Sequence, residues 1–197
     1  MPNPKAITEI PTIDVVMVVI ETEDAAYALD TANKIALEPQ IEEQAAVKLI
    51  VKGMLKAQKP AVTTITGNKI TITDNVFAPE VVKILQGGTI KYWQDAAKSQ
   101  ESTTPSEYGI SGYTPPTVGS GVKGEVFTLH AYSAQYDTSG QVVQYEKISY
   151  PNCQGVPIAL SSEDGAFRAP EYTINSAPSK EQAPYSISYV SSLPVVS

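Results

Sequence analysis

Cysteine and histidine are almost absent from the chain, and their scarcity excludes several kinds of site. Among 197 residues there is one cysteine, Cys153, and one histidine, His130. A lone cysteine rules out an internal disulfide framework and is compatible with folding in a reducing compartment. A metal site needs three or four ligands, and no cysteine or carboxylate stands at ligand spacing from His130. We therefore expect no metal and no cofactor, and we interpret His130 as a strand residue that makes a hydrogen bond.

Recognisable catalytic motifs are also missing. The sequence contains no Gly-x-Ser-x-Gly elbow for a nucleophilic serine. Its glycine-rich stretch, residues 109–124, lacks the spacing of a phosphate-binding loop followed by a helix. Cys153 comes after a proline turn but has no local signature of a catalytic thiol. The sequence therefore predicts that the protein is not an enzyme.

Excess basic charge and long apolar runs are absent too. Fourteen Lys and Arg residues against 21 Asp and Glu residues give a net charge of -7, which excludes a basic nucleic-acid-binding surface. The most apolar early run, residues 13–20, contains Asp14, lacks a basic leader and is too short to cross a bilayer. We interpret this run as a buried strand, and we expect neither secretion nor membrane association.

The residues that are abundant are typical of an antiparallel β-protein. Thr, Ser, Val, Ile and Tyr are plentiful, and turn residues interrupt the chain about every ten residues. This pattern predicts a single, mainly β domain over residues 1–197, an antiparallel β-sandwich or barrel with one short flanking α-helix. Residues 1–11 contain three prolines and should form an N-terminal arm. Strands are expected at residues 12–22, 34–38 (ended by Pro39), 125–135, 141–150, 158–160, 167–175 and 185–190.

Residues 42–58 fit two structures. At period two, their apolar residues share a face opposite Lys48, Lys52 and Lys56. At period 3.6, the apolar residues form a helical stripe with acidic residues at its N-terminus. Gly53 and the β-branched residues favour a strand, and the helix remains open.

Residues 61–93 contain the clearest local signals. β-Branched residues alternate on both sides of Gly67-Asn68, a pair that suits a two-residue hairpin turn. Pro79 suits the first turn of a helix, and an apolar face follows until a glycine pair ends it. This helix, at about residues 79–86, is too short to be stable alone and should pack on a sheet. We expect replacement of Leu85 to unfold the protein.

Residues 94–123 are rich in Gly, Ser, Thr and Pro and show no periodic apolar face. A segment of this length inside a compact domain is commonly a functional or disordered loop. We interpret it as an extended surface loop that becomes ordered on another subunit. The candidate inter-subunit contacts are Tyr108, Tyr113, Pro115 and Pro116, and substitutions of the two tyrosines should spare folding and affect association alone.

Acidic residues gather in two places along the first part of the chain. On charge alone they form a solvated surface that aids solubility. Alternatively, they form a negative surface that keeps a polyanion from binding. The residues concerned are Glu21, Glu23, Asp24, Glu38, Glu42 and Glu43.

One part of the chain resembles a known family. A Thr-Gly turn leads into a strand, an aspartate turn, a Phe-x-Pro-Glu helix start at residues 77–80, a short apolar helix and a glycine. In this order the segment is similar to the major tail proteins, or tail tube proteins, of tailed bacteriophages and related prophage elements. The resemblance is clear over about residues 30–93 and only architectural elsewhere.

The resemblance implies a β-sandwich or barrel that assembles into hexameric rings, which stack into a hollow tube for passage of the genome into the host. The protein would be part of the virion and would assemble in the bacterial host cytoplasm. Its partners would be other copies of itself and tape-measure, tail terminator and baseplate proteins, with DNA only transiently inside the tube. The acidic residues become candidates for the lumen, and deletion of residues 94–123 should spare the fold but stop tube growth. A contractile or a non-contractile tail, and a phage or a phage-derived particle, all remain open.

A second hypothesis, from another class, is a β-sandwich binding module such as an adhesin or a carbohydrate-binding domain. Its stacking platform would be made by tyrosines 108, 113, 132 and 136. The lack of a secretion signal and the single tryptophan disfavour it. A glycan array, or a titration of Trp93 fluorescence, separates this hypothesis from the first.

Overall fold

A computed structural model describes residues 11–161, 164–165 and 168–196. The N-terminal arm expected at residues 1–11 therefore lies outside the described residues except for Pro11. No helix in the described part of the chain has the length and apolarity needed to cross a bilayer.

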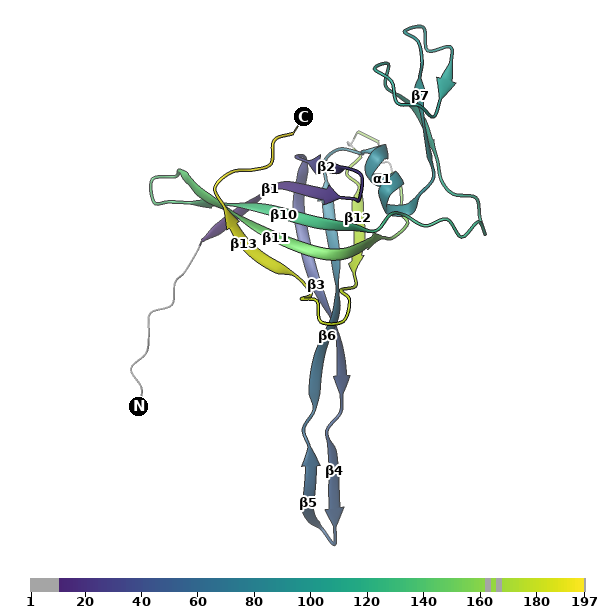
Figure 1. The fold of residues 1–197 in the computed structure, drawn as a ribbon. Coiled ribbons are helices and arrows are strands. Elements are labelled where there is room, and N and C mark those ends of the chain that lie inside the picture. The colour runs from purple at the N-terminus through teal and green to yellow at the C-terminus, as the bar shows by residue number, and fades with distance from the viewer. Residues whose placement is uncertain (1–10, 162–163, 166–167, 197) are drawn as a thin grey trace.

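The body of the protein is one antiparallel sheet of eight strands that curves around the main hydrophobic core (Figure 1). Seven strands follow the order β2-β1-β10-β11-β12-β6-β3, and the eighth, β13, pairs with β11. This architecture, with one short helix beside it, confirms the predicted fold class. The strands are β1 (Thr12–Glu21), β2 (Ala26–Leu29), β3 (Ala32–Gln44), β6 (Val62–Asp74), β10 (Phe127–Tyr136), β11 (Val142–Gly155), β12 (Glu171–Ser176) and β13 (Ser186–Val190).

The core forms where alternate residues of these strands face the helix. Val18 and Ile20 of β1 lie beside Leu129 of β10, and all three are fully buried. Strands nearer the other end of the sheet order contribute Ile70 and Ile72 of β6 and Tyr172 and Ile174 of β12. These residues pair directly across the two strands and belong to the same core. Cross-strand pairs of this kind are the main stabilising unit of a sheet.

The helix α1 (Pro79–Gln86) forms where it was predicted. Proline at its start and Glu80 in its first turn suit the N-terminus. Its apolar face, which includes Val82 and Leu85, is buried in the core. The C-terminal carbonyl groups are satisfied in part by neighbours, since the backbone N–H of Glu125 donates to the carbonyl of Ile84 at 2.8 Å.

Two glycines let the chain pass against α1 at backbone distance. A Cβ atom on Gly155 of β11 would lie 2.4 Å from Cα and Cβ of Leu85, and one on Gly124 would lie 2.2 Å from the carbonyl oxygen of Leu85. Separations below 3 Å are hard-sphere clashes, so only glycine fits at either position. The helix is held between β11 and residues 122–125.

The hairpin turn predicted at Gly67-Asn68 was wrong. Both residues lie inside the continuous strand β6, where Asn68 is fully buried and its Nδ2 donates to the carbonyl of Pro184 at 2.8 Å. Gly67 is required because a Cβ there would lie 2.4 Å from the carbonyl oxygen of Ser176. The glycine marks the close approach of another chain segment, as glycines within strands commonly do.

The predicted end of a strand at Pro39 was also wrong. β3 continues through Pro39, which pairs with Asn68, as far as Gln44. β3 is the last strand in the sheet order, and an edge strand tolerates proline because the missing N–H faces no partner. The strand expected at residues 158–160 does not form, and Phe167 lies outside the described residues.

Residues 42–58 are strands, which confirms the favoured interpretation. β3 and β6 extend together beyond the body, and β4 (Val47–Val51) and β5 (Met54–Lys59) continue the same ribbon to a turn at Lys52-Gly53. We call residues 41–65 the projecting hairpin; it leaves the body as a two-stranded finger (Figure 1).

A second projection leaves the body at the end of α1. It contains β7 (Thr89–Trp93), β8 (Glu101–Ser102) and β9 (Ile110–Thr114), which form a three-stranded antiparallel sheet in the order β8-β7-β9. The segment 94–123 therefore extends from the body, but it includes two strands that its composition did not predict. We call residues 89–114 the projecting sheet.

Candidate assembly surface

The projecting hairpin exposes aliphatic side chains on a ribbon that no other part of the described chain covers. Val47 is 65% exposed, Ile50 60% and Leu49 56%. A two-stranded hairpin is only marginally stable alone in water, and a contiguous exposed apolar patch usually marks an interaction site. The remaining large exposed apolar residues of the hairpin are Ile41, Val51, Met54, Leu55, Val62 and Ile65.

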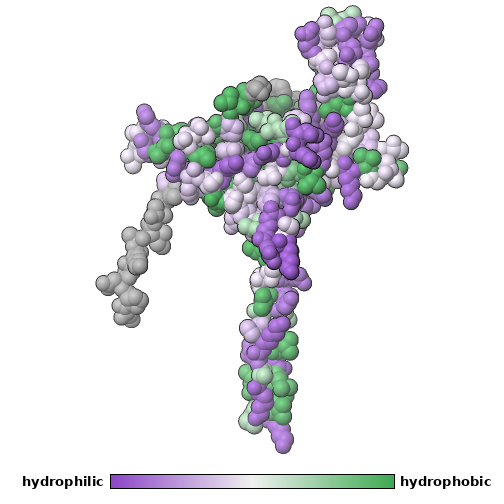
Figure 2. All heavy atoms as spheres, viewed as in Figure 1, coloured by the Kyte–Doolittle hydropathy of each residue, from purple (hydrophilic) through white to green (hydrophobic). Residues whose placement is uncertain are grey.

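The distal half of this hairpin is also basic, within an acidic protein. Residues 45–61 include Lys48, Lys52, Lys56 and Lys59 and no acidic residue, although the chain as a whole carries -7. In Figure 2 hydrophobic and hydrophilic residues alternate along the finger. A surface that combines aliphatic and ammonium groups fits a partner that is apolar and acidic.

The four candidate contact residues of the segment 94–123 lie on or next to the projecting sheet. Tyr108 is 40% exposed, Pro115 is exposed and Pro116 is half-buried. Tyr113 differs from the others because its hydroxyl donates to the carbonyl of Gly87 at 2.6 Å and accepts from Nε2 of Gln86 at 2.9 Å. The contacts with another subunit remain predictions, and the two hydrogen bonds of Tyr113 indicate that it also helps to hold the projecting sheet on the body.

Replacing Tyr113 by phenylalanine should lower the stability of the subunit. The change leaves the Gly87 carbonyl and the Gln86 amide without their partner, which typically costs about 1–3 kcal/mol. For a chain of this size, each kcal/mol lost from the free energy of unfolding lowers Tm by roughly 2–4 °C. Thermal unfolding followed by circular dichroism measures this, with Tyr108→Phe as the matched control. Equal melting temperatures for the two variants would show that the Tyr113 hydroxyl does not anchor the projecting sheet.

The six acidic candidates are exposed, and the fold keeps them in two groups. Glu21, Glu23 and Asp24 lie at the turn between β1 and β2, whereas the other three lie along β3. Oε2 of Glu38 lies 4.0 Å from Nζ of Lys69 on the neighbouring strand. Glu42 and Glu43 lie at the base of the projecting hairpin, opposite Thr64 and Thr63. All six remain candidates for a surface that faces solvent or a lumen.

One of these acids takes part in a polar chain that resembles a catalytic triad. His130 Nδ1 lies 2.8 Å from Oγ of Ser149, and its Nε2 lies 2.8 Å from Oε2 of Glu21. The three residues belong to adjacent strands, and Ser149 also pairs with Ser186 of β13. The arrangement confirms the predicted hydrogen bond of His130 and acts as a cross-strand contact.

Cys153 is enclosed in the core. Its side chain is fully buried, its Sγ lies 3.2 Å from the carbonyl oxygen of Tyr150, and burial raises the pKa of the thiol to about 12. A thiol of this pKa is neutral at physiological pH, and the thiolate is the reactive form.

We expect Cys153 to be inert in the folded protein. A rise in pKa of about three units lowers the thiolate fraction roughly a thousandfold at neutral pH, and burial adds a steric block. Labelling with a chromogenic disulfide reagent should detect no thiol in native protein and one thiol in guanidinium chloride. Rapid labelling of the native protein would contradict the buried placement.

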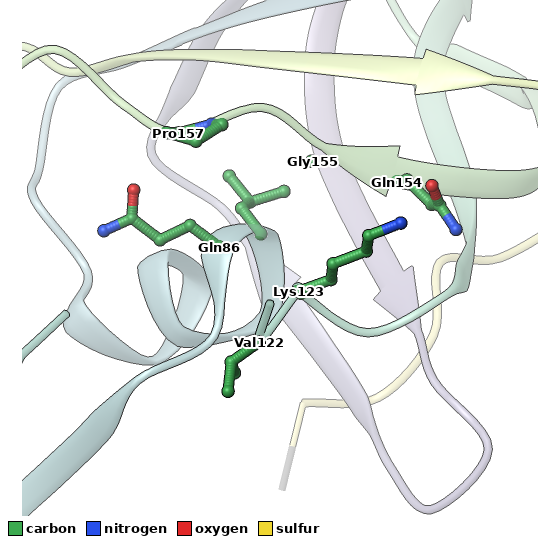
Figure 3. Close-up of a pocket in the computed structure, with 8 residues that line it drawn as sticks. Gln86, Val122, Lys123, Gln154, Gly155 and Pro157 are labelled. Atoms are coloured by element: carbon green, nitrogen blue, oxygen red, sulfur yellow. The ribbon is translucent and has the colours of Figure 1, made fainter. Parts of the chain in front are cut away.

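A small cavity lies beside the end of α1 (Figure 3). Its volume is about 150 Å³, and Gln86, Lys123 and Gln154 are among the residues that line it. The amide of Gln86 donates to Tyr113 and accepts from the backbone N–H of Ile158 at 3.0 Å. The cavity therefore lies at a structural junction between α1, the end of β11 and residues 122–124.

The residues of the alternative binding hypothesis do not gather into one platform. Tyr108 and Tyr113 lie on the projecting sheet, whereas Tyr132 and Tyr136 lie on β10. Tyr132 is buried against Met17 and Val19, so its ring face is not open to a sugar. Within the described residues there is also no group of three His, Cys, Asp or Glu side chains that could hold a metal ion.

Comparison with known proteins adds little. No protein-family model matches the chain, and no curated protein matches it. Among solved structures, a chain from the cryo-EM structure of the anti-feeding prophage baseplate, six-fold symmetrised, is similar over 97% of this chain and 98% of its own length. The identity is 7% and the TM-score is 0.32. A TM-score this low does not establish that the two chains share a fold.

Proposed function

We propose that the protein is a structural subunit that assembles with copies of itself, and that it forms the tail tube of a phage or a phage-derived particle. In this proposal hexameric rings stack into a hollow conduit for the genome. The observation that carries it is the projecting hairpin, because nine large aliphatic side chains at residues 41–65 are exposed on a ribbon with no partner in the described chain. The resemblance of residues 30–93 to tail tube proteins adds the specific kind of assembly.

The energetics of the hairpin favour assembly. Full burial of one large aliphatic side chain stabilises by roughly 1.5–3 kcal/mol. At half of that value, nine side chains contribute on the order of 10 kcal/mol, which is comparable to the cost of association, about 4–15 kcal/mol. In a long head-to-tail row there is about one such contact per copy, whereas an isolated pair joined by one contact has only half a contact per copy. Growth of an assembly is therefore favoured over isolated pairs.

The charge of the subunit suits a conduit for DNA. A net charge of -7 per copy is multiplied in every ring, and exposed acids such as Glu42 and Glu43 would line part of that surface. A wall of the same sign as the phosphates does not retain DNA. Tape-measure, terminator and baseplate proteins would bind at the ends of such a tube, and assembly would take place in the bacterial host cytoplasm.

Electron microscopy of negatively stained protein, over a range of concentrations, tests the proposal. We expect hollow tubes or stacked rings of uniform diameter, with or without a tape-measure protein to initiate them. Sedimentation velocity on the same samples gives the size distribution. A chain that stays monomeric in every condition would refute the proposed function.

A further inference from the structure

The pole of the body away from the projecting hairpin carries a groove. It lies between β2, the loop after β6 and the start of α1, and it has a volume of about 490 Å³. Tyr27 and Val76 line it and are 38% and 53% exposed. The elements that border the groove, β2 and α1, lie on the side of the body away from the hairpin tip (Figure 1).

A residue from a distant part of the chain forms part of the groove wall. Val196, which follows β13 by several residues, lies among the lining residues and is 62% exposed. The groove therefore combines segments that are far apart in the sequence.

The rim of the groove is acidic and offers a free strand edge. Asp30 and Glu80 line it, and Glu23 and Asp24 precede β2. β2 is the first strand in the sheet order, so its outer edge carries no ladder within the described residues. An exposed edge of this kind is a template for a strand from another molecule.

The tip of the projecting hairpin has the complementary properties. Its four lysines alternate with aliphatic residues, and all 21 acidic residues of the chain lie outside residues 45–61. At about 3.3 Å per residue, the ten steps from Ile41 to Val51 carry the tip roughly 30 Å from the body. The tip therefore cannot reach the groove of its own copy, which lies at the other pole.

We propose that the hairpin tip of one copy docks in the β2–α1 groove of the next copy, with lysines against Asp30, Glu80 and the acids before β2. This inference rests on the proposed function and names the surface through which copies join. The two surfaces differ, so the contact is heterologous: it repeats head to tail and gives the assembly a direction. Because charge pairs across it are part of the contact, assembly should weaken as salt is raised.

Disulfide cross-linking tests the contact directly. The variant with both Lys52→Cys and Asp30→Cys carries one new thiol at each pole, while Cys153 is buried and unreactive. After mild oxidation of assembled protein, we expect a ladder of dimers, trimers and longer products on a non-reducing gel. Each single variant should stop at dimers. The matched control is Lys52→Cys with Glu107→Cys, because Glu107 is exposed on the projecting sheet and away from the groove.

The outcomes separate this inference from the proposed function. Tubes in the microscope together with a ladder of cross-linked products on the gel support the docking contact and the tube function. Tubes without this ladder of products overturn the docking contact and leave the tube function in place. Absence of any assembly overturns both. Pelleting of the protein with phosphatidylglycerol vesicles, lost on Lys48→Glu with Lys52→Glu, would show that the hairpin is a lipid-binding element and would overturn the docking contact.

Charge reversal gives a second readout that does not depend on oxidation. Lys48→Glu with Lys52→Glu should raise the concentration needed for assembly at least about tenfold, the effect of roughly 1.4 kcal/mol. Adding Asp30→Lys and Glu80→Lys in the same chain should restore assembly. If the variant with all four substitutions assembles at the same concentration as the parent chain, the pairing of these surfaces is supported. If this variant has the parent's melting temperature but does not assemble, the result counts against the pairing.

Discussion

Replacing residues 45–61 by Asn-Gly should abolish assembly and leave the body folded. Gln44 and Val62 are direct partners across β3 and β6, and Asn-Gly is the preferred two-residue turn between paired strands. The shortened hairpin therefore closes without strain. The removed segment is exposed throughout and contributes nothing to the buried core, so we expect a change in Tm of only a few degrees.

Sedimentation velocity and negative-stain microscopy measure the loss of assembly in the shortened chain, and circular dichroism checks its fold. A milder form of the same test replaces Leu49 and Ile50 by glutamate, with Val118→Glu as the control. Val118 is fully exposed on the loop after the projecting sheet, so its change alters charge without touching the hairpin. Normal tubes from the shortened chain would show that the projecting hairpin is not an assembly element.

Replacing Gly155 by valine should have the largest effect on stability. Even one Cβ would lie 2.4 Å from backbone and side-chain atoms of Leu85, so α1 would have to move away from β11. Overpacking of a core costs typically 1–3 kcal/mol and sometimes more, and here the obstacle is helix backbone that cannot rotate away. We expect a loss of about 3 kcal/mol or more, from a total stability of about 5–15 kcal/mol.

The matched control for Gly155→Val is Gly112→Val. Gly112 lies in β9 and has no positive φ, and a Cβ added there would meet no atom within 4 Å. Urea unfolding compares the two variants, and the control should stay within about 0.5 kcal/mol of the parent. Equal losses in the two variants would contradict the close contact between α1 and β11.

Much of the body could be predicted because its signals are local. The apolar run at residues 13–20 gave the first strand to within one residue. Pro79 and the glycine pair bounded the helix at residues 79–86. The turn at residues 137–140 separated β10 from β11 as expected. In each case the physical cause lies in the segment itself.

The errors arose where a distant segment decides the conformation. Gly67 suits a turn by its own chemistry, but the carbonyl of Ser176 passes so close that only glycine fits in the strand. Pro39 ends a central strand but is tolerated at the edge. Tyr113 has no sequence neighbour that reveals its bonds to Gln86 and Gly87. Pairings of this kind depend on the fold and cannot be seen in the local pattern.

The candidate site was only half visible in the sequence. The ambiguity of residues 42–58 arose because their apolar residues fit both a period of two and a period of 3.6. Neither pattern predicts a ribbon that is exposed on both faces, because that exposure depends on the absence of a covering layer. The net charge of -7 averaged over the chain and concealed the local cluster of lysines at the hairpin tip.

Amide hydrogen exchange over residues 47–59, compared between dilute free subunits and assembled particles, tests most directly whether the projecting hairpin joins one copy to the next. In the free subunit a solvent-exposed ribbon should exchange quickly, because its hydrogen bonds open locally at little cost. We predict that assembly slows this exchange at least about a hundredfold, while the rates in the core strands β10 and β11 stay nearly the same. Assembled particles whose hairpin amides exchange as fast as those of the free subunit would contradict the account.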